Sequence, residues 1–393
     1  MLIPYVLFLS PVLTSLMLIH HQVYTTSILD LSQHDLEITI PNITDNRFWA
    51  FPFYDFYGNN FGSVSIAVVS PVGTYLIRRA SDALVQPGIE YTTPNALCPY
   101  PKYTGYINFP TTYGSLWNRI LVRQNTTADL DIVHSYQRNI SITPVPRQIS
   151  QPGTLPAPPL TAELFASNKT GTAKLLDLLA RFAQFNQPEV LSDAYRVASI
   201  LGLAGLAGGV YTPPAGVNLT QVVGAVSANA GLTTSTPKDT LVLGNGWYTG
   251  TSNISGNFGV DYAVRAYTAE TGYLQLAEDI AVYPVYKSGP AGDALEGDEA
   301  LLFTFSGRPP VNVDGFWSLT LYGEVMFLFP QHLPLHTNHL RPILTPRSHR
   351  TNTSSPTRSP ATKSAIAPPP CASTTAALST APTPARRTVL SKF

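Results

Sequence analysis

The sequence predicts a mainly β protein with a helical middle segment and a tail that cannot fold. Short stretches near both ends of the body alternate apolar and polar residues with a period of two. A segment between them repeats its apolar residues with a helical period, and the composition changes abruptly after Pro330. These features indicate two β-sandwich domains separated by helices.

The first β-domain is predicted over residues 45–145. Val64, Ile66 and Val68 alternate on one face of a predicted strand at 63–70. Further strands are predicted at 74–79, 103–110, 119–125 and 131–145. Short strands spaced by roughly ten residues are typical of a sandwich rather than of βαβ units.

A linker and a helical domain follow. Residues 146–160 are rich in proline, which blocks both helix and central strand. Residues 161–237 form the predicted helical domain, where one helical stripe comprises Leu175, Leu178, Leu179, Phe182 and Phe185. The run GLAGLAGG at 202–209 lacks both a preceding strand and the G-x-G-x-x-G spacing, so it indicates a helix end rather than a phosphate loop.

The second β-domain is predicted over residues 238–330. VDYAVRAYTA (260–269) and LLFTFS (301–306) are predicted strands, and 316–329 is a predicted hairpin that turns at Gly323. The tail, 331–393, contains no Gly, Asp, Glu, Tyr, Trp or Met and is dense in Pro, Ser and Thr. Such a segment cannot bury enough apolar surface to offset its ordering entropy, so we expect disorder.

The charge distribution bears on partners. The net charge is zero, but the tail carries eight Lys and Arg and no acid, which leaves sixteen basic against twenty-four acidic residues in the body. Nucleic-acid binding needs clustered basic residues to neutralise phosphates. The acidic body therefore argues against a nucleic-acid partner.

The first 22 residues predict a signal peptide, with a signal anchor as the alternative. Residues 2–19 are apolar and uncharged, which is typical of a secretory signal and just long enough to span a bilayer. We therefore expect a secreted or extracellular protein, or a membrane protein facing the lumen if the segment is retained. Glycosylation sequons support the secretory route: Asn42, Asn125, Asn139, Asn168, Asn218, Asn253 and Asn352. Cys98 and Cys371 are the two cysteines, too few for a disulfide framework.

Several segments together resemble a known pair of families. They are NRFWAFPFYDFYGNNFG, SPVGTYLIRR, GSLWNRILV, GNFGVDYAVRAY and PPVNVDGFWSLTLY. The chain resembles the tandem families of unknown function numbered 1254 (N-terminal) and 1214 (C-terminal) over roughly residues 45–330. The resemblance implies an immunoglobulin-like β-sandwich, a small helical domain and a jelly-roll β-sandwich, and it implies no activity.

The resemblance stops at Pro330. The strands that would complete the jelly roll are replaced by a sequence with a different composition. We therefore expect an incomplete jelly roll and a tail, 331–393, that arose from a shifted reading frame or an unspliced intron. Sequencing the transcript across the codon for Pro330 tests this expectation.

Motifs for catalysis are absent. The chain contains no G-x-S-x-G, H-E-x-x-H or paired C-x-x-C, so we expect no cofactor and no metal. Asp131 and His134 are predicted to point to opposite faces of a strand, which argues against a metal pair. The candidate catalytic residues are the carboxylates Asp55, Asp314 and Asp261, since glycoside hydrolysis needs two. The alternative role for Asp55 and Asp314 is to cap a turn, and that for Asp261 is an ion pair with Arg265.

Two segments with a tryptophan among other aromatic residues, 46–60 and 314–324, are candidate ligand platforms. The ligand-binding candidates are Trp49, Tyr57, Arg265, Trp317 and Tyr322. The density of rings in the first segment favours packing between sheets or domains. Two function classes stay open. One is a non-catalytic module, which either binds carbohydrate or a small hydrophobic ligand or has a structural role and builds a homo-oligomer. The other is a glycosidase-like hydrolase with its carboxylates in an interdomain cleft.

Overall fold

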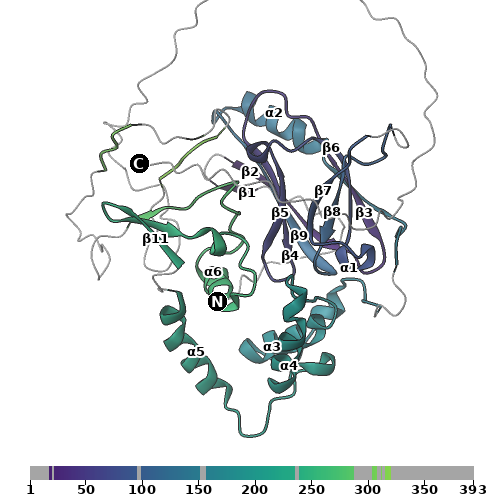
Figure 1. The fold of residues 1–393 in the computed structure, drawn as a ribbon, viewed down its shortest axis with the longest axis vertical. Coiled ribbons are helices and arrows are strands. Elements are labelled where there is room, and N and C mark those ends of the chain that lie inside the picture. Colours follow the sequence, from purple (N-terminus) through teal and green to yellow (C-terminus); the bar gives the residue numbers. More distant parts are fainter. Residues whose placement is uncertain are drawn as a thin grey trace, which may run out of the picture. The chain divides into compact units, whose positions relative to one another are not determined.

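The computed structural model describes residues 17–19, 22–94, 99–150, 156–234, 239–286, 303–307, 311 and 315–319. The protein is mainly β, with three sheets and several helices, as the sequence predicts (Figure 1). The predicted tail, most of the 316–329 hairpin and both cysteines lie outside the described residues. All of the helices and strands named below belong to one compact unit.

The first sheet has five strands in the order β1-β2-β9-β4-β5, and neighbouring strands are antiparallel. The strands are β1 (Met17–Ile19), β2 (Gln22–Asp30), β9 (Tyr113–Leu121), β4 (Trp49–Asp55) and β5 (Asn60–Ser65). β2 and β9 pair along their whole length, from Gln22 opposite Leu121 to Asp30 opposite Tyr113. This long pairing makes β9 the centre of the sheet.

The second sheet has the order β10-β3-β6-β8-β7. Its strands are β10 (Ser141–Val145), β3 (Asp35–Ile40), β6 (Gly73–Arg79), β8 (Gly105–Phe109) and β7 (Gly88–Tyr91). β6 and β8 are parallel, and the other pairs are antiparallel. β7 is therefore an edge strand.

One hydrophobic core is shared by both sheets. It contains Phe51 and Phe53 of β4, Ile38 of β3 and Ile107 of β8, all fully buried. Phe109 receives the edges of two other core rings, those of Phe53 and Phe61. The aromatic residues of segment 46–60 thus stabilise the fold chiefly by filling this core, as the packing alternative predicts.

Three predictions for the N-terminal part were wrong. One is the strand at 63–70, because β5 ends at Ser65 and Ile66–Val68 form a 3-10 turn instead of alternating on a strand face. The sheets begin well before residue 45, because β2 and β3 are integral strands; their alternating burial, from Val23 to Ile40, matches the pattern of a half-buried strand. Residues 131–138 are helical rather than extended, since α2 covers Thr127–Arg138. Thr126 caps α2 by accepting a hydrogen bond from the backbone N–H of Asp129, 3.3 Å away.

The proline-rich linker is anchored to the β-sheets. Arg147 forms an ion pair with Asp82 and donates to the carbonyl of Leu31. The backbone N–H of Leu160 donates to Asp30 at 2.7 Å. The described parts of the linker are therefore bound to the β-sheet domain through these contacts.

The middle segment is helical. The helices are α1 (Ala80–Ala83), which lies earlier in the chain, and α3 (Gly171–Ala183), α4 (Ala194–Leu203) and α5 (Leu219–Thr234). Short 3-10 turns are η1 (Ile66–Val68), η2 (Ala162–Phe165), η3 (Leu191–Asp193) and η4 (Ala207–Gly209). Phe182 of α3 packs with Tyr113 of β9 at 5.6 Å between ring centroids, so α3 is joined to the first sheet. The GLAGLAGG run ends α4 and turns at Gly205, Gly208 and Gly209, whose φ angles are positive, as predicted.

The third sheet consists of β11 (Thr240–Gly244), β12 (Trp247–Gly250) and β13 (Val285–Tyr286). Asn245 and Gly246, with φ of 50° and 80°, connect β11 to β12 as the two central residues of a tight hairpin turn. The turn η6 (Ser252–Ile254) and the helix α6 (Tyr262–Thr271) follow β12. The prediction of a strand at 260–269 was therefore wrong: Asp261 caps a helix here through the N–H of Val264.

The described residues of the predicted strand 301–306 and of segment 315–319 lie in neither helix nor strand. Within the part of the chain that the structure describes, no helix has the length and apolar character needed to cross a membrane.

Candidate functional site

Asp55 holds the turn between β4 and β5. Its side chain is 3% exposed, and its Oδ1 accepts hydrogen bonds from the backbone N–H groups of Tyr57 at 2.8 Å and Asn59 at 2.9 Å. Its Oδ2 accepts the side-chain N–H of Asn59 at 2.8 Å. Gly58 completes the turn with a φ of 88°. Asp55 thus has the turn-capping role that the sequence offered as the alternative to catalysis.

A charged and aromatic group surrounds this turn, which we name the Arg265 cluster: Asp55, Tyr57, Glu189, Tyr262 and Arg265. The Arg265 guanidinium lies over two rings, 5.0 Å from the centroid of Tyr57 and 4.8 Å from that of Tyr262. Stacking on two aromatic faces stabilises a cation in a partly buried site. The cluster joins the β4–β5 turn to α6.

The two hydroxyl groups of the cluster tie it to the segment after α3. The Tyr57 hydroxyl donates to the carbonyl of Asn186 at 2.6 Å, and the Tyr262 hydroxyl donates to Asp193 at 2.7 Å. Asp193 also forms an ion pair with Arg196. The two rings that stack on Arg265, those of Tyr57 and Tyr262, are therefore both held in place by hydrogen bonds of their hydroxyl groups.

Glu189 is the second carboxylate of the cluster. Its Oε1 accepts the side-chain N–H of Asn257 at 2.8 Å, while its Oε2 is buried and has no hydrogen-bond partner among the described residues. Burial raises the pKa of Glu189, the charge of Asp55 raises it further, and Arg265 acts in the opposite direction. Burial likewise raises the pKa of Asp55, against the hydrogen bonds from Asn59 and the charge of Arg265.

A small pocket lies beside Glu189. It measures about 60 Å³ and is bordered by Arg79 at the end of β6, by Thr111 and Thr112 before β9, and by Gln187. This volume exceeds the minimum of about one water molecule but is far below that of ligand sites, at roughly 300–1,000 Å³. The pocket has room for solvent rather than for a substrate.

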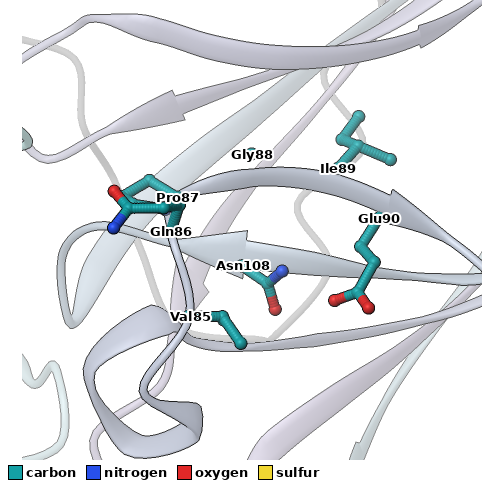
Figure 2. A pocket seen from close by; sticks show the side chains of 7 residues that line it. All are labelled: Val85, Gln86, Pro87, Gly88, Ile89, Glu90 and Asn108. Atoms are coloured by element: carbon teal, nitrogen blue, oxygen red, sulfur yellow. The ribbon is translucent and has the colours of Figure 1, made fainter. Parts of the chain in front are cut away.

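A larger pocket lies on the edge strand β7 (Figure 2). It measures about 260 Å³, and its lining includes Gln86, Gly88 and Glu90 of β7 and its approach, and Asn108 of β8. The Asn108 amide and the Glu90 carboxylate lie on the same side of the β7–β8 pair, whereas Ile89 points to the other side. Gly88 is paired with Asn108 and has no side chain, which leaves space between the polar groups.

Arg78 of β6 organises the polar groups of this β7–β8 pocket. Its Nε donates to the Oδ1 of Asn108 at 2.8 Å, and its Nη2 lies 3.5 Å from Glu90. The guanidinium stacks on the ring of Tyr106, 4.0 Å from the centroid. Because the Arg78 Nε donates to its Oδ1, the Nδ2 is the end of the Asn108 amide that can donate, in a residue that is 2% exposed.

The other predicted site residues are dispersed. Trp49 is 3% exposed and packs against Phe51 inside the core, so it offers no surface to a ligand. Trp317 is 46% exposed and contacts Phe305. Asp314 and Tyr322 lie outside the described residues. Asp261 is at the N-terminus of α6, four residues before Arg265 on a helix rather than on a strand.

Asp131 and His134 do not point to opposite faces of a strand, as was predicted, because both belong to α2, where residues three apart share a face. Among the described residues, no group of three or more His, Cys, Asp or Glu is placed to hold a metal ion. The six described sequon asparagines are exposed.

Sequence reasoning missed Glu189, Tyr262 and the β7–β8 pocket. The Gln86-Pro87-Gly88 turn before a short strand was the available signal for the pocket. No local pattern links Glu189 to the β4–β5 turn, because the contact depends on how α3 packs on the first sheet.

Comparison with known proteins gives a family without an assigned activity. Residues 20–144, which span β2 to β10, match the family described as "Protein of unknown function (DUF1254)". The resemblance to family 1254 is confirmed over these residues, and the resemblance to family 1214 stays a prediction. No curated protein matches the chain.

Among solved structures, the chain is similar to the VPA0106 protein from Vibrio parahaemolyticus. The identity is 12% and the TM-score is 0.40, over 66% of this chain and 59% of that one. The chain therefore spans about three fifths of the length of that protein.

Proposed function

We propose that the chain is a secreted, non-catalytic binding protein that takes a polar ligand of the carbohydrate class in the β7–β8 pocket. The observation that carries the proposal is the arrangement of Arg78, Asn108 and Glu90 on one face of the sheet. A buried cation holds a side-chain amide and a partly exposed carboxylate in place before any ligand arrives. Such preorganisation lowers the entropic cost of binding.

The chemistry of the lining matches hydroxyl groups. The Asn108 Nδ2 donates, the Glu90 carboxylate accepts, and the exposed Gln86 side chain can do either. Neighbouring hydroxyls on a sugar ring present both donors and acceptors, so one ring can satisfy the amide and the carboxylate together. A small hydrophobic ligand would leave these polar groups unpaired, which is costly.

The volume of the pocket limits the size of the ligand that can enter. A volume of about 260 Å³ is just below the range of roughly 300–1,000 Å³ for drug-sized ligands. We therefore expect one sugar unit, or the end of a longer chain, to enter.

The hydrolase alternative has less support because its carboxylates are otherwise engaged. Asp55 directs both oxygens to its own turn, and Asp261 caps α6. Glycoside hydrolysis needs one carboxyl group free to donate a proton and another to act as nucleophile or base. Asp314, the remaining candidate, lies outside the described residues.

The finer architecture is part of the proposal. The shared core of the two five-stranded sheets supports an immunoglobulin-like β-sandwich, and the three-stranded sheet is what we assign to an incomplete jelly roll. The predicted signal segment of residues 1–22 overlaps the first sheet, because Met17–Ile19 form β1 and Gln22 begins β2. Secretion is supported by the apolar sequence of residues 2–16 that precedes β1.

The test is titration calorimetry with mono- and oligosaccharides selected on a glycan array, with chromatography of the sugars afterwards. We expect saturable binding without any product. Glu90→Gln should weaken binding about tenfold, because it removes a charge-assisted hydrogen bond. Glu163→Gln, at an exposed glutamate in η2, is the matched control and should bind like the wild type. Hydrolysis of a glycan, or binding that Glu90→Gln does not change, would contradict the proposal.

A further inference from the structure

Exposure divides the asparagines of this protein into two classes. Among asparagines whose side chains the structure describes, the six in sequons are all exposed: Asn42, Asn125, Asn139, Asn168, Asn218 and Asn253. Of the eight others, five are buried, namely Asn59, Asn60, Asn108, Asn118 and Asn186. If the sequons were chance matches to a short pattern, their asparagines would be buried about as often as the rest.

The hydroxyl residue is exposed in five of the six described sequons, and Ser255 is half-buried. In four sequons the first and third residues are exposed while the middle one is buried or half-buried, as in Asn42, Ile43 and Thr44. Where the chain is extended, such residues i and i+2 lie on one side, whereas the Asn218 sequon leads into α5. The amide and the hydroxyl that a glycosyl-transferring enzyme must engage are therefore displayed together.

The amide nitrogens are compatible with a bulky substituent. Asn218 accepts hydrogen bonds from the N–H groups of Thr220 and Gln221 through its Oδ1, which leaves its Nδ2 free of these contacts. The Nδ2 of Asn139 donates to the carbonyl of Ser135 at 3.0 Å, and one hydrogen still remains on nitrogen after substitution. Neither local structure has to be broken to attach a sugar.

Asn253 differs from the other five. Its sequon forms the 3-10 turn η6, and the hydroxyl of Ser255 is half-buried and donates to the carbonyl of Thr251 at 3.1 Å. The turn closes over only four residues, so it can form as soon as this segment is made. The hydroxyl is then occupied within the turn.

We infer that Asn42, Asn125, Asn139, Asn168 and Asn218 carry N-linked glycans and that Asn253 stays unmodified. In the reaction the Nδ2 attacks the anomeric carbon of an oligosaccharide carried on a polyprenyl diphosphate. The N–C bond forms, the C–O bond to the diphosphate breaks, the amide loses one proton, and the polyprenyl diphosphate leaves. This modification is independent of the binding proposal, since the sugars would be attached whether or not the pocket takes a ligand.

The positions of the sequons leave one region open. No sequon lies between residues 43 and 124, which comprise strands β4 to β9 and the whole lining of the β7–β8 pocket. The glycans would cover the β3–β4 loop, both ends of α2 and the helical segment. The segment of the chain without a sequon thus contains the whole lining of the pocket that we assign to ligand binding.

The test is cell-free translation of the full chain in the presence of endoplasmic-reticulum vesicles, followed by protease protection and peptide N-glycosidase. With the tail sequon removed by Asn352→Gln in every chain, we expect a protected species that carries five glycans and collapses to a single band on deglycosylation. Thr44→Ala, Thr127→Ala, Ser141→Ala, Thr170→Ala and Thr220→Ala should each remove one glycan, whereas Ser255→Ala should remove none. A chain that stays outside the vesicles, or enters them without sugar, overturns the proposal, as does a glycan lost in Ser255→Ala.

Asn46 and Asn245 provide a second control, because both are exposed but neither lies in a sequon. Asn46→Gln and Asn245→Gln should leave the five-glycan species unchanged. Loss of a glycan in either variant would show that exposure, rather than the sequon, decides the modification.

Discussion

The ring of Phe48 meets the ring of Phe316 edge to face, with their centroids 5.6 Å apart. These residues belong to the two tryptophan-bearing segments, 46–60 and 314–324, that lie far apart in the sequence. The tryptophans themselves do not form a shared wall, since Trp49 is in the core and Trp317 is exposed. The contact between the segments is a packing contact that holds residues 315–317 against the start of β4.

Phe316→Ala tests this contact. We expect the free energy of unfolding to fall by about 0.5–1.5 kcal/mol, because an edge-to-face aromatic pair is lost. The measurement is urea denaturation followed by tryptophan fluorescence. Leu319→Ala is the control: Leu319 is 54% exposed, so its removal should change the free energy by no more than about 0.5 kcal/mol. Equal effects from both variants would contradict the contact.

The Arg265 cluster should make stability depend on pH. Burial raises the pKa of Asp55 and Glu189 above their ordinary values of 3.8 and 4.5, so the folded protein holds these protons more tightly than the unfolded chain does. The contribution of these groups to stability is therefore complete at low pH and is lost as the pH rises through the raised pKa values. We expect the free energy of unfolding to decrease above about pH 4 for this reason.

Glu189→Gln should flatten this dependence, because the amide cannot ionise. Urea denaturation over a series of pH values measures the effect. Asp131→Asn removes an exposed carboxylate of α2 and serves as the control. The explanation fails if Asp131→Asn flattens the profile as much as Glu189→Gln.

The cap of α2 and the sequon at Asn125 overlap, and two neighbouring substitutions separate them. Thr126→Ala removes the cap and keeps the sequon, so the unglycosylated protein should lose about 1 kcal/mol of unfolding free energy. Thr127→Ala removes the sequon and keeps the cap, so its stability should stay within about 0.5 kcal/mol of the wild type. The reverse order of effects would show that Thr126 is not the cap.

Among the described residues that form ion pairs, we expect substitution of Asp82 to lower the free energy of unfolding the most. It is 2% exposed and accepts both Nε and Nη2 of Arg79, at 2.8 and 2.9 Å, in addition to its ion pair with Arg147. Asp82→Asn removes the negative charge that both arginines pair with and replaces one acceptor oxygen by a donor nitrogen, and breaking a buried pair costs about 3–5 kcal/mol. Glu37→Gln, which breaks a more exposed pair with Lys102, should cost about 1 kcal/mol or less in the same urea measurement. Similar costs would contradict a structural role for the Asp82 network.

The sequence predicted the elements whose signal is local. The alternation at 74–79 and 103–110 corresponds to β6 and β8, and the stripe from Leu175 to Phe182 lies on α3. The prediction of strands was wrong where a capping residue begins a helix. Thr126 and Asp261 each cap a helix in a stretch that also alternates in polarity. Neither stretch has a long enough apolar repeat to separate the two periods, so the cap was the better signal.

The candidate site was predicted only in part. Asp55, Tyr57 and Arg265 were named from their residue types, and the structure brings them together. Their arrangement could not be predicted, because Arg265 is 210 positions after Asp55 and reaches it through the packing of α6. The β7–β8 pocket was missed because Asn108, Arg78 and Gly88 are united only by the sheet order β6-β8-β7.

Hydrogen–deuterium exchange with and without the sugar that binds best tests the central claim most directly. If the ligand enters the β7–β8 pocket, exchange should slow in peptides covering residues 85–91 and 105–109, and the recovered sugar should be intact. Peptides covering 186–196 and 262–268, around the Arg265 cluster, should exchange at unchanged rates. Protection confined to the Arg265 cluster, or a sugar recovered in cleaved form, would contradict the account.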